Sequence, residues 1–278
     1  MNSESDDIGF IYKFDMSEEI THFKSIPEDV QISAECSVVN VIYESFVIPA
    51  DEDYLMSRLL AQKGLVRGFY WAAAQATEKY LKAFLLMNGE GVKEFKGHPI
   101  KNLFETASKI DTSLVNIDIM PHQSIQVESC YSSLLKKYTI QQFLEELEEH
   151  GSADNRYNAF GVKYNTGHLC AMDSLSSKLR SKIGVIPIYK SFKNSSSDLI
   201  QIFEKNNPWF STIENLSLSP IPSLDFPLQS TASITKLEIL IKYKENPAYS
   251  LALRWLNAKM KIPNINELLS TNQTPSAR

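Results

Sequence analysis

Cysteine is scarce in this 278-residue sequence, and the three cysteines are far apart. Cys36, Cys130 and Cys170 are odd in number, and none of them belongs to a Cys-x-x-Cys pair. A disulfide framework and a zinc knuckle both require paired or closely spaced cysteines, so the sequence predicts neither. We expect buried free thiols that behave as small apolar side chains.

Several catalytic motifs are missing as well. The sequence contains no glycine-rich phosphate-binding loop, no Gly-x-Ser-x-Gly elbow and no His-Glu-x-x-His pair. These absences exclude P-loop nucleotide hydrolysis, serine hydrolases built on that elbow and zincin-type metalloproteases. Because the histidines and cysteines also lack the spacing of metal ligands, we expect no cofactor and no bound transition metal.

Long apolar runs and a basic excess are also absent. No uninterrupted apolar run approaches eighteen residues, and the first ten residues, MNSESDDIGF, are acidic where a secretory signal would be basic. We therefore expect a cytoplasmic protein with no membrane partner.

Residues 1–50 carry two basic and ten acidic side chains, whereas residues 51–278 carry 26 basic and 23 acidic ones. So small an excess argues against general coating of nucleic acid and leaves room for a local site.

What the sequence does have is apolar residues at helical spacing, which predicts an all-α fold. The first thirty residues show little periodicity, and the run 38–48 is either a strand or the start of a helix that Pro49 ends. Asp51 and Asp53 can then cap a helix start. Helices are predicted at 51–63, 65–88, about 99–110, 140–150 and 166–184, with Thr166 as a cap, and beyond a polar linker at 198–204, 236–244 and 248–259.

The segment 65–88 is apolar on most sides, which predicts a central helix packed by several neighbours. Its polar side chains form a narrow seam that includes Glu78, Lys79 and Lys82. Such a seam needs water, a protein partner or a ligand, so the three residues are candidates for ligand binding. The alternative is an ion pair within the helix between Glu78 and Lys82, which are four residues apart.

Three stretches resemble the HEPN family of helical proteins: FYWAAAQATEKYLKAFLLMNG at 69–89, GHPIKNL at 97–103 and DNRYNAFG at 154–161. The resemblance covers residues 50–184 and implies an up-and-down bundle of four to five helices that is often dimeric. Residues 1–49 are then an acidic, partly irregular N-terminal segment. Residues 185–278 form a smaller helical C-terminal extension of unknown role.

Members of this family have two kinds of activity. Some members are metal-independent endoribonucleases whose Arg and His, four to six residues apart, meet across a dimer, and others bind nucleotides or nucleic acid. Here the first histidine after Arg156 is His168, with eleven residues between them. This departure favours binding of RNA or a nucleotide, within a stress-response or phage-defence system and with a partner protein from a neighbouring gene, as the resemblance implies. A ribonuclease and a non-catalytic dimerisation or scaffold module remain the alternatives.

Individual residues have both a functional and a structural interpretation. Arg156 can grip a phosphate with its planar guanidinium or form a salt bridge. His98 and His168 can exchange protons near neutral pH or act as capping residues at helix starts, where a neutral imidazole is favoured. The stretch 174–197 has five basic and no acidic residues, so it is either a strip that faces phosphates or a solvated helix face; its first members are Lys178, Arg180 and Lys182.

Overall fold

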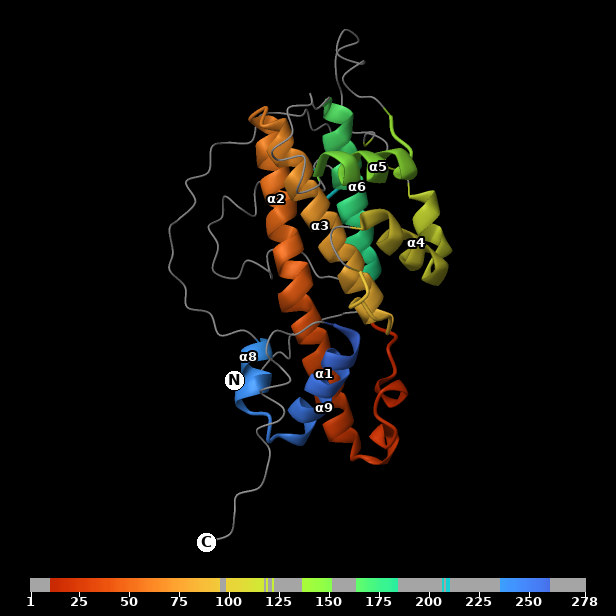
Figure 1. Ribbon diagram of the computed structural model, residues 1–278, viewed down its shortest axis with the longest axis vertical. Coiled ribbons are helices and arrows are strands. Elements are labelled where there is room, and N and C mark those ends of the chain that lie inside the picture. Colours follow the sequence, from red (N-terminus) through yellow and green to blue (C-terminus); the bar gives the residue numbers. More distant parts are fainter. Residues whose placement is uncertain are drawn as a thin grey trace, which may run out of the picture.

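A computed structural model describes residues 11–95, 99–117, 119, 122, 137–151, 164–184, 207, 209–210 and 236–260. Its α-helices are α1 (Glu28–Ile42), α2 (Ile48–Gln62), α3 (Val66–Met87), α4 (Ile100–Ile110), α5 (Ile140–Gly151), α6 (Thr166–Ile183), α8 (Lys236–Lys242) and α9 (Pro247–Lys259). The described residues include no β-strand (Figure 1). The predicted all-α class is therefore confirmed.

The first long helix is continuous from α1 through a π-helical turn, η3 (Tyr43–Val47), into α2 (Figure 1). The prediction that Pro49 ends an element is wrong. Proline lacks the N–H that donates to the carbonyl four residues earlier in an α-helix. Just before Pro49 the helix has π-type hydrogen bonds instead, since the Ile48 N–H donates to the Tyr43 carbonyl five residues earlier. Pro49 then lies in the first turn of α2, where a missing N–H costs little.

This continuous helix, Glu28–Ala61, is long and apolar enough to cross a membrane by length and composition alone. Its most apolar 18-residue window has a mean hydropathy of 1.2, and 39% of that window is buried inside the fold. α1 packs against α9 and α2 packs against α3, so part of the apolar surface is used for internal packing. Length and composition therefore fit a core helix as well as a spanning one.

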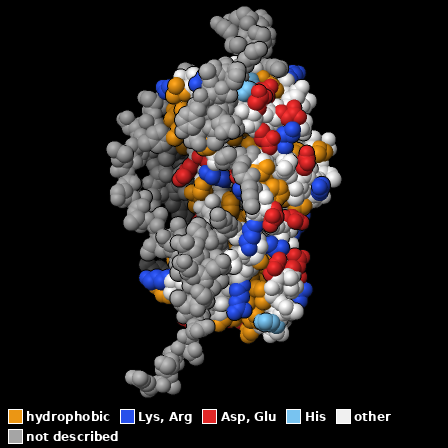
Figure 2. Space-filling model, viewed as in Figure 1, with side chains coloured by type: hydrophobic (Ala, Val, Ile, Leu, Met, Phe, Trp, Pro, Cys, Tyr) orange, Lys and Arg blue, Asp and Glu red, His pale blue; other side chains and the backbone are white. Residues whose placement is uncertain are grey.

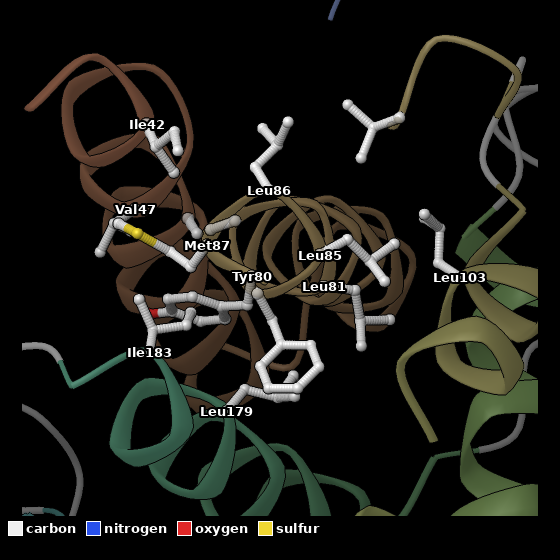
Figure 3. Packing of buried hydrophobic residues seen from close by; sticks show 14 of the residues in the cluster. Ile42, Val47, Tyr80, Leu81, Leu85, Leu86, Met87, Leu103, Leu179 and Ile183 are labelled. Carbon is white, nitrogen blue, oxygen red and sulfur yellow. The ribbon is translucent and has the colours of Figure 1, made fainter. Parts of the chain in front are cut away.

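The central position of α3 follows from its composition. It contacts α2, α4, α5 and α6, and most of its side chains are buried. Figure 3 shows Leu85 of α3 directed toward Leu103 of α4, while Tyr80 lies beside Ile183 of α6. A helix with apolar residues on most sides is stable only where neighbours cover each of those sides, and here they do.

The predicted bounds of α4, α5 and α6 hold to within about two residues. α6 ends at Gly184, whose φ of 72° lies in the left-handed region that glycine adopts without a steric cost. At its start the cap is Asn165 rather than Thr166, because the Asn165 side chain accepts the Gly167 N–H. Thr166 is already helical.

Residues outside the predicted bundle cover its ends. Residues 11–13 cross the carboxyl ends of two helices, where the Ile11 N–H donates to the Ile183 carbonyl and the Lys13 N–H donates to the Met87 carbonyl. The C-terminal helix α9 packs along α1, in the lower part of Figure 1. The predicted domain boundary between residues 49 and 50 falls inside a continuous helix. Of the two alternatives for the run 38–48, a strand or the start of a helix, the structure has a helix.

Candidate functional site

Two buried ion pairs join α2 to α6. Arg58 of α2 contacts Asp173 of α6, and Asp51 of α2 contacts Arg180 of α6. All four side chains are fully or almost fully buried. Each helix thus carries an aspartate followed seven residues later by an arginine, and the reciprocal pairing of these motifs requires the two helices to run antiparallel. Asp51, expected as a helix cap, instead neutralises a buried charge.

Two tyrosines extend this buried network. The Tyr54 hydroxyl donates to Asp173 at 2.5 Å, and the Tyr80 hydroxyl of α3 donates to Asp51. Burial raises the pKa of both tyrosines well above the usual value, and the facing carboxylates raise it further. Burial also raises the pKa of Asp173, against the opposing effect of Arg58. Both hydroxyls therefore stay protonated and donate, and the network joins three helices by charge-assisted contacts.

His168 is buried in the first turn of α6 and is occupied by structural contacts. Its Nδ1 accepts the Asn165 N–H at 3.0 Å, which closes a capping box, and its Nε2 lies 2.5 Å from Glu146 Oε2 of α5. We assign the ring proton to Nε2, because Nδ1 accepts an N–H. Three tyrosine rings pack around the imidazole, those of Tyr70, Tyr138 and Tyr164. His168 therefore holds the start of α6 against α5.

Ion pairs also occupy the polar seam of α3. The expected pair is present, with Lys82 Nζ at 2.5 Å from Glu78 Oε1. Lys79 instead contacts Asp53 of α2. Burial raises the pKa of Asp53, while the contact with Lys79 lowers it. The seam thus contains one ion pair within α3 and one between α3 and α2. Glu78, Lys79 and Lys82 are therefore all engaged in ion pairs in this structure.

A cavity of about 310 Å³ lies where α3 and α6 end. Its wall combines apolar, polar and charged side chains, namely Ile11, Lys13, Phe84, Asn88, Asp111, Ser181 and Lys182. Lys182 Nζ lies 2.6 Å from Asp111 Oδ2. Hydrogen bonds from Lys182 and Ser113 lower the pKa of Asp111 to about 2, so its carboxylate is ionised at neutral pH. The cavity thus offers two ammonium groups, one of them already paired with a carboxylate.

The structure separates the predicted site residues. His98 and Arg156 lie outside the described residues. On α6, Lys178 is exposed and Lys182 lines the cavity, whereas Arg180 is buried. The prediction that Arg180 belongs to an outward-facing cationic strip is wrong, because the helix turns its side chain toward α2, where Asp51 neutralises it.

The buried network was missed at the sequence level, although it has a signal there. The spacing of Asp51 and Arg58 equals that of Asp173 and Arg180, and both pairs lie in predicted helices. Residues seven apart return to nearly the same helix face. Two such motifs therefore predict reciprocal pairing of antiparallel helices. The cavity has no comparable signal, because its lining comes from four separate stretches of the chain.

Among the described residues, no group of three or more His, Cys, Asp or Glu side chains is placed to hold a metal ion. No known family model matches the chain, and no curated protein or solved structure matches it either. The function must therefore be inferred from the residues themselves.

Proposed function

We propose that the chain binds a nucleotide, or the terminal nucleotide of an RNA, in the cavity between the ends of α3 and α6. The observation that carries the proposal is that Lys13 and Lys182 line one cavity together with the exposed side chain of Ile11. Ammonium groups bind phosphate, and Ile11 offers the rest of a nucleotide an apolar contact. Asn88 and Ser181 add hydrogen-bonding groups to the same wall. The resemblance of residues 50–184 to HEPN proteins supports the same class of ligand.

The size and charge of the surface favour a small ligand over a long duplex. The cavity volume of about 310 Å³ is at the lower end of the range for small-molecule sites. On the face in Figure 2, basic and acidic side chains are interspersed over the described residues, without a broad field of one sign. Extended phosphate contacts need such a field, whereas one or two phosphates need only a local pair of lysines.

The described residues favour binding over cleavage. Metal-independent cleavage of RNA needs a base, an acid and a cation at the scissile phosphate. His168 is buried against Glu146 and Asn165, and no histidine lines the cavity. Arg156 could supply only the cation, because its pKa is too high for proton exchange at neutral pH.

Two substitutions in the cavity should change affinity in opposite directions. Lys182→Gln removes a cation and should weaken ATP binding by about tenfold, the loss of one charge-assisted contact. Asp111→Asn should strengthen binding, because it releases Lys182 from its carboxylate. Isothermal titration calorimetry with ATP, AMP and inorganic phosphate measures both effects. Lys24→Gln, a substitution of an exposed lysine outside the cavity, is the matched control and should leave affinity unchanged.

A purely structural role of the pair predicts a different result, namely that both substitutions weaken binding or that neither has an effect. A short RNA ending in a phosphate, compared with the same RNA ending in a hydroxyl, tests whether the ligand is an RNA end. RNA cleavage in excess chelator would contradict the binding proposal if it is abolished by Arg156→Ala and by His98→Ala or His168→Ala, in variants whose urea unfolding shows that they are folded. That result would favour the ribonuclease.

A further inference from the structure

A short stretch of the C-terminal extension lies on the α2–α6 pair. Asn207 is fully buried there, and its side-chain amide donates to the Tyr54 hydroxyl, which itself donates to Asp173. The Ser177 hydroxyl of α6 donates to the Trp209 carbonyl at 3.4 Å. Asn207 also shapes its own segment, because its Oδ1 accepts the Trp209 N–H at 3.1 Å. The segment is thus bound through defined polar contacts and folded locally to make them.

Phe210 extends the contact to the second ion pair. Its ring centroid lies 6.0 Å from Arg180 Cζ and 5.9 Å from the centroid of the Tyr54 ring. The first distance is within the range of cation–π attraction. Asn207 therefore contacts the network at the Arg58–Asp173 pair, through Tyr54, and Phe210 contacts it at the pair that Arg180 forms with Asp51.

We propose that this face of α2 and α6 is a docking site for Asn207, Trp209 and Phe210 of the same chain, and that this docked segment is a removable cover over the two buried ion pairs. The ion pairs make removal feasible, because charges that lose their cover gain hydration by water, which offsets part of the lost contact energy. Trp209 and Phe210 are only partly buried, so their departure gives up only part of each side chain's contact area.

The same chain is the expected source of the segment, because the connection through residues 185–206 makes docking intramolecular. A tethered segment is present at a high effective concentration at its own site, so it outcompetes the same segment of another copy in dilute solution. Its carboxamide and aromatic ring match the Tyr54 hydroxyl and the Arg180 guanidinium, and these groups define the chemistry of the site.

Cys170 provides a reporter for opening of this face. It is buried on α6, one turn before Asp173, and burial raises its pKa to about 12. A thiol reagent therefore reacts with it only when the fold opens locally around α6 or the chain unfolds. The chain carrying Cys36→Ser and Cys130→Ser retains Cys170 as its single thiol.

In that background, Asn207→Asp with Phe210→Ala should speed labelling of Cys170 by about tenfold, with little change in the urea midpoint of unfolding. Asn207→Asp is nearly isosteric but replaces the donor amide with a carboxylate, and the only Tyr54 hydroxyl proton is already donated to Asp173.

Added peptide KNNPWFST, the sequence of residues 205–212, should slow labelling again by filling the vacated site. Tyr243→Ala removes an exposed aromatic ring elsewhere in the C-terminal extension and should leave the rate unchanged.

An unchanged labelling rate in the double variant overturns the proposal. So does a rate that rises only in step with global destabilisation and does not respond to the peptide, since the segment would then be an ordinary part of the core. If the double variant fails to fold, the single variant Asn207→Asp takes its place in the same labelling experiment. A labelling rate of the parent protein that falls as protein concentration rises assigns the segment to a second copy and overturns docking within one chain.

Discussion

At Gly151, the last residue of α5, the structure has no room for a side chain. A Cβ atom added there would lie 2.5 Å from the Ala74 Cβ and 2.8 Å from the Tyr70 carbonyl oxygen of α3. The close approach brings the end of α5 directly onto the backbone of the central helix. This glycine is therefore required for packing between two helices, whereas at Gly184 the requirement is a left-handed backbone.

Gly151→Ala should destabilise the protein by about 1–3 kcal/mol, because the added methyl group must displace backbone atoms that cannot move without disturbing α3. Urea unfolding followed by circular dichroism measures the change. Gly91→Ala is the matched control, since the nearest atom to its added Cβ is 3.8 Å away, an ordinary contact distance. Equal free energies of unfolding for the two variants would show that α5 can move away from α3 at little cost.

At the scale of helices, the reciprocal ion pairs specify how α2 and α6 align. A slide of α2 by one turn would break both contacts and leave four charges buried beside the wrong neighbours. Burial of an ion pair costs about as much free energy as the pair returns, so the contribution of these pairs to net stability is small. We infer that their role is specificity, because apolar side chains tolerate more than one alignment.

A double-mutant cycle on Asp51 and Arg180 should reveal this role. Arg180→Met alone should destabilise the protein by about 3–5 kcal/mol, because it removes the cation that compensates the Asp51 carboxylate in the interior. Adding Asp51→Leu should restore part of the loss, since the pair is then replaced by apolar side chains, while the buried Tyr80 hydroxyl loses its acceptor. Urea unfolding of the two single variants and the double variant gives the coupling free energy. Additive losses would mean that the two side chains act independently.

At the scale of the whole molecule, segments from both ends of the chain complete the core. The Trp255 ring of α9 is fully buried and lies 4.7 Å from the ring of Phe14, and α9 packs along α1. The Lys259 ammonium of the same helix lies 3.1 Å from a Glu19 carboxylate oxygen. The C-terminal extension is therefore connected through its described helices to the N-terminal part of the chain.

Trp255→Ala should cost about 3–5 kcal/mol, as expected for removing a large side chain from a core that cannot fully collapse. Urea unfolding measures it, and Arg254→Ala is the control, because this neighbouring side chain is exposed on the same helix. If the two variants were equally stable, α9 would be an accessory to the fold rather than part of its core.

The sequence by itself determined the helical class and most helix bounds, because the 3.6-residue period of apolar residues and the capping residues are local properties of the chain. It also predicted the Glu78–Lys82 ion pair, which needs only four residues of one helix. The prediction that Pro49 ends a helix or strand is wrong because the π-helical turn before it changes the hydrogen-bond pattern, and no residue type marks that turn.

Only the tertiary structure decided which charges face inward. Arg180 and Lys182 are two residues apart on α6 and look alike in the sequence, yet one is buried against Asp51 and the other lines a cavity with Asp111. Whether each cation is buried depends on the position of the carboxylate that another part of the chain places beside it. The same holds for Asn207, since a polar residue in a long connecting segment is expected in solvent unless the fold places a partner such as Tyr54 beside it.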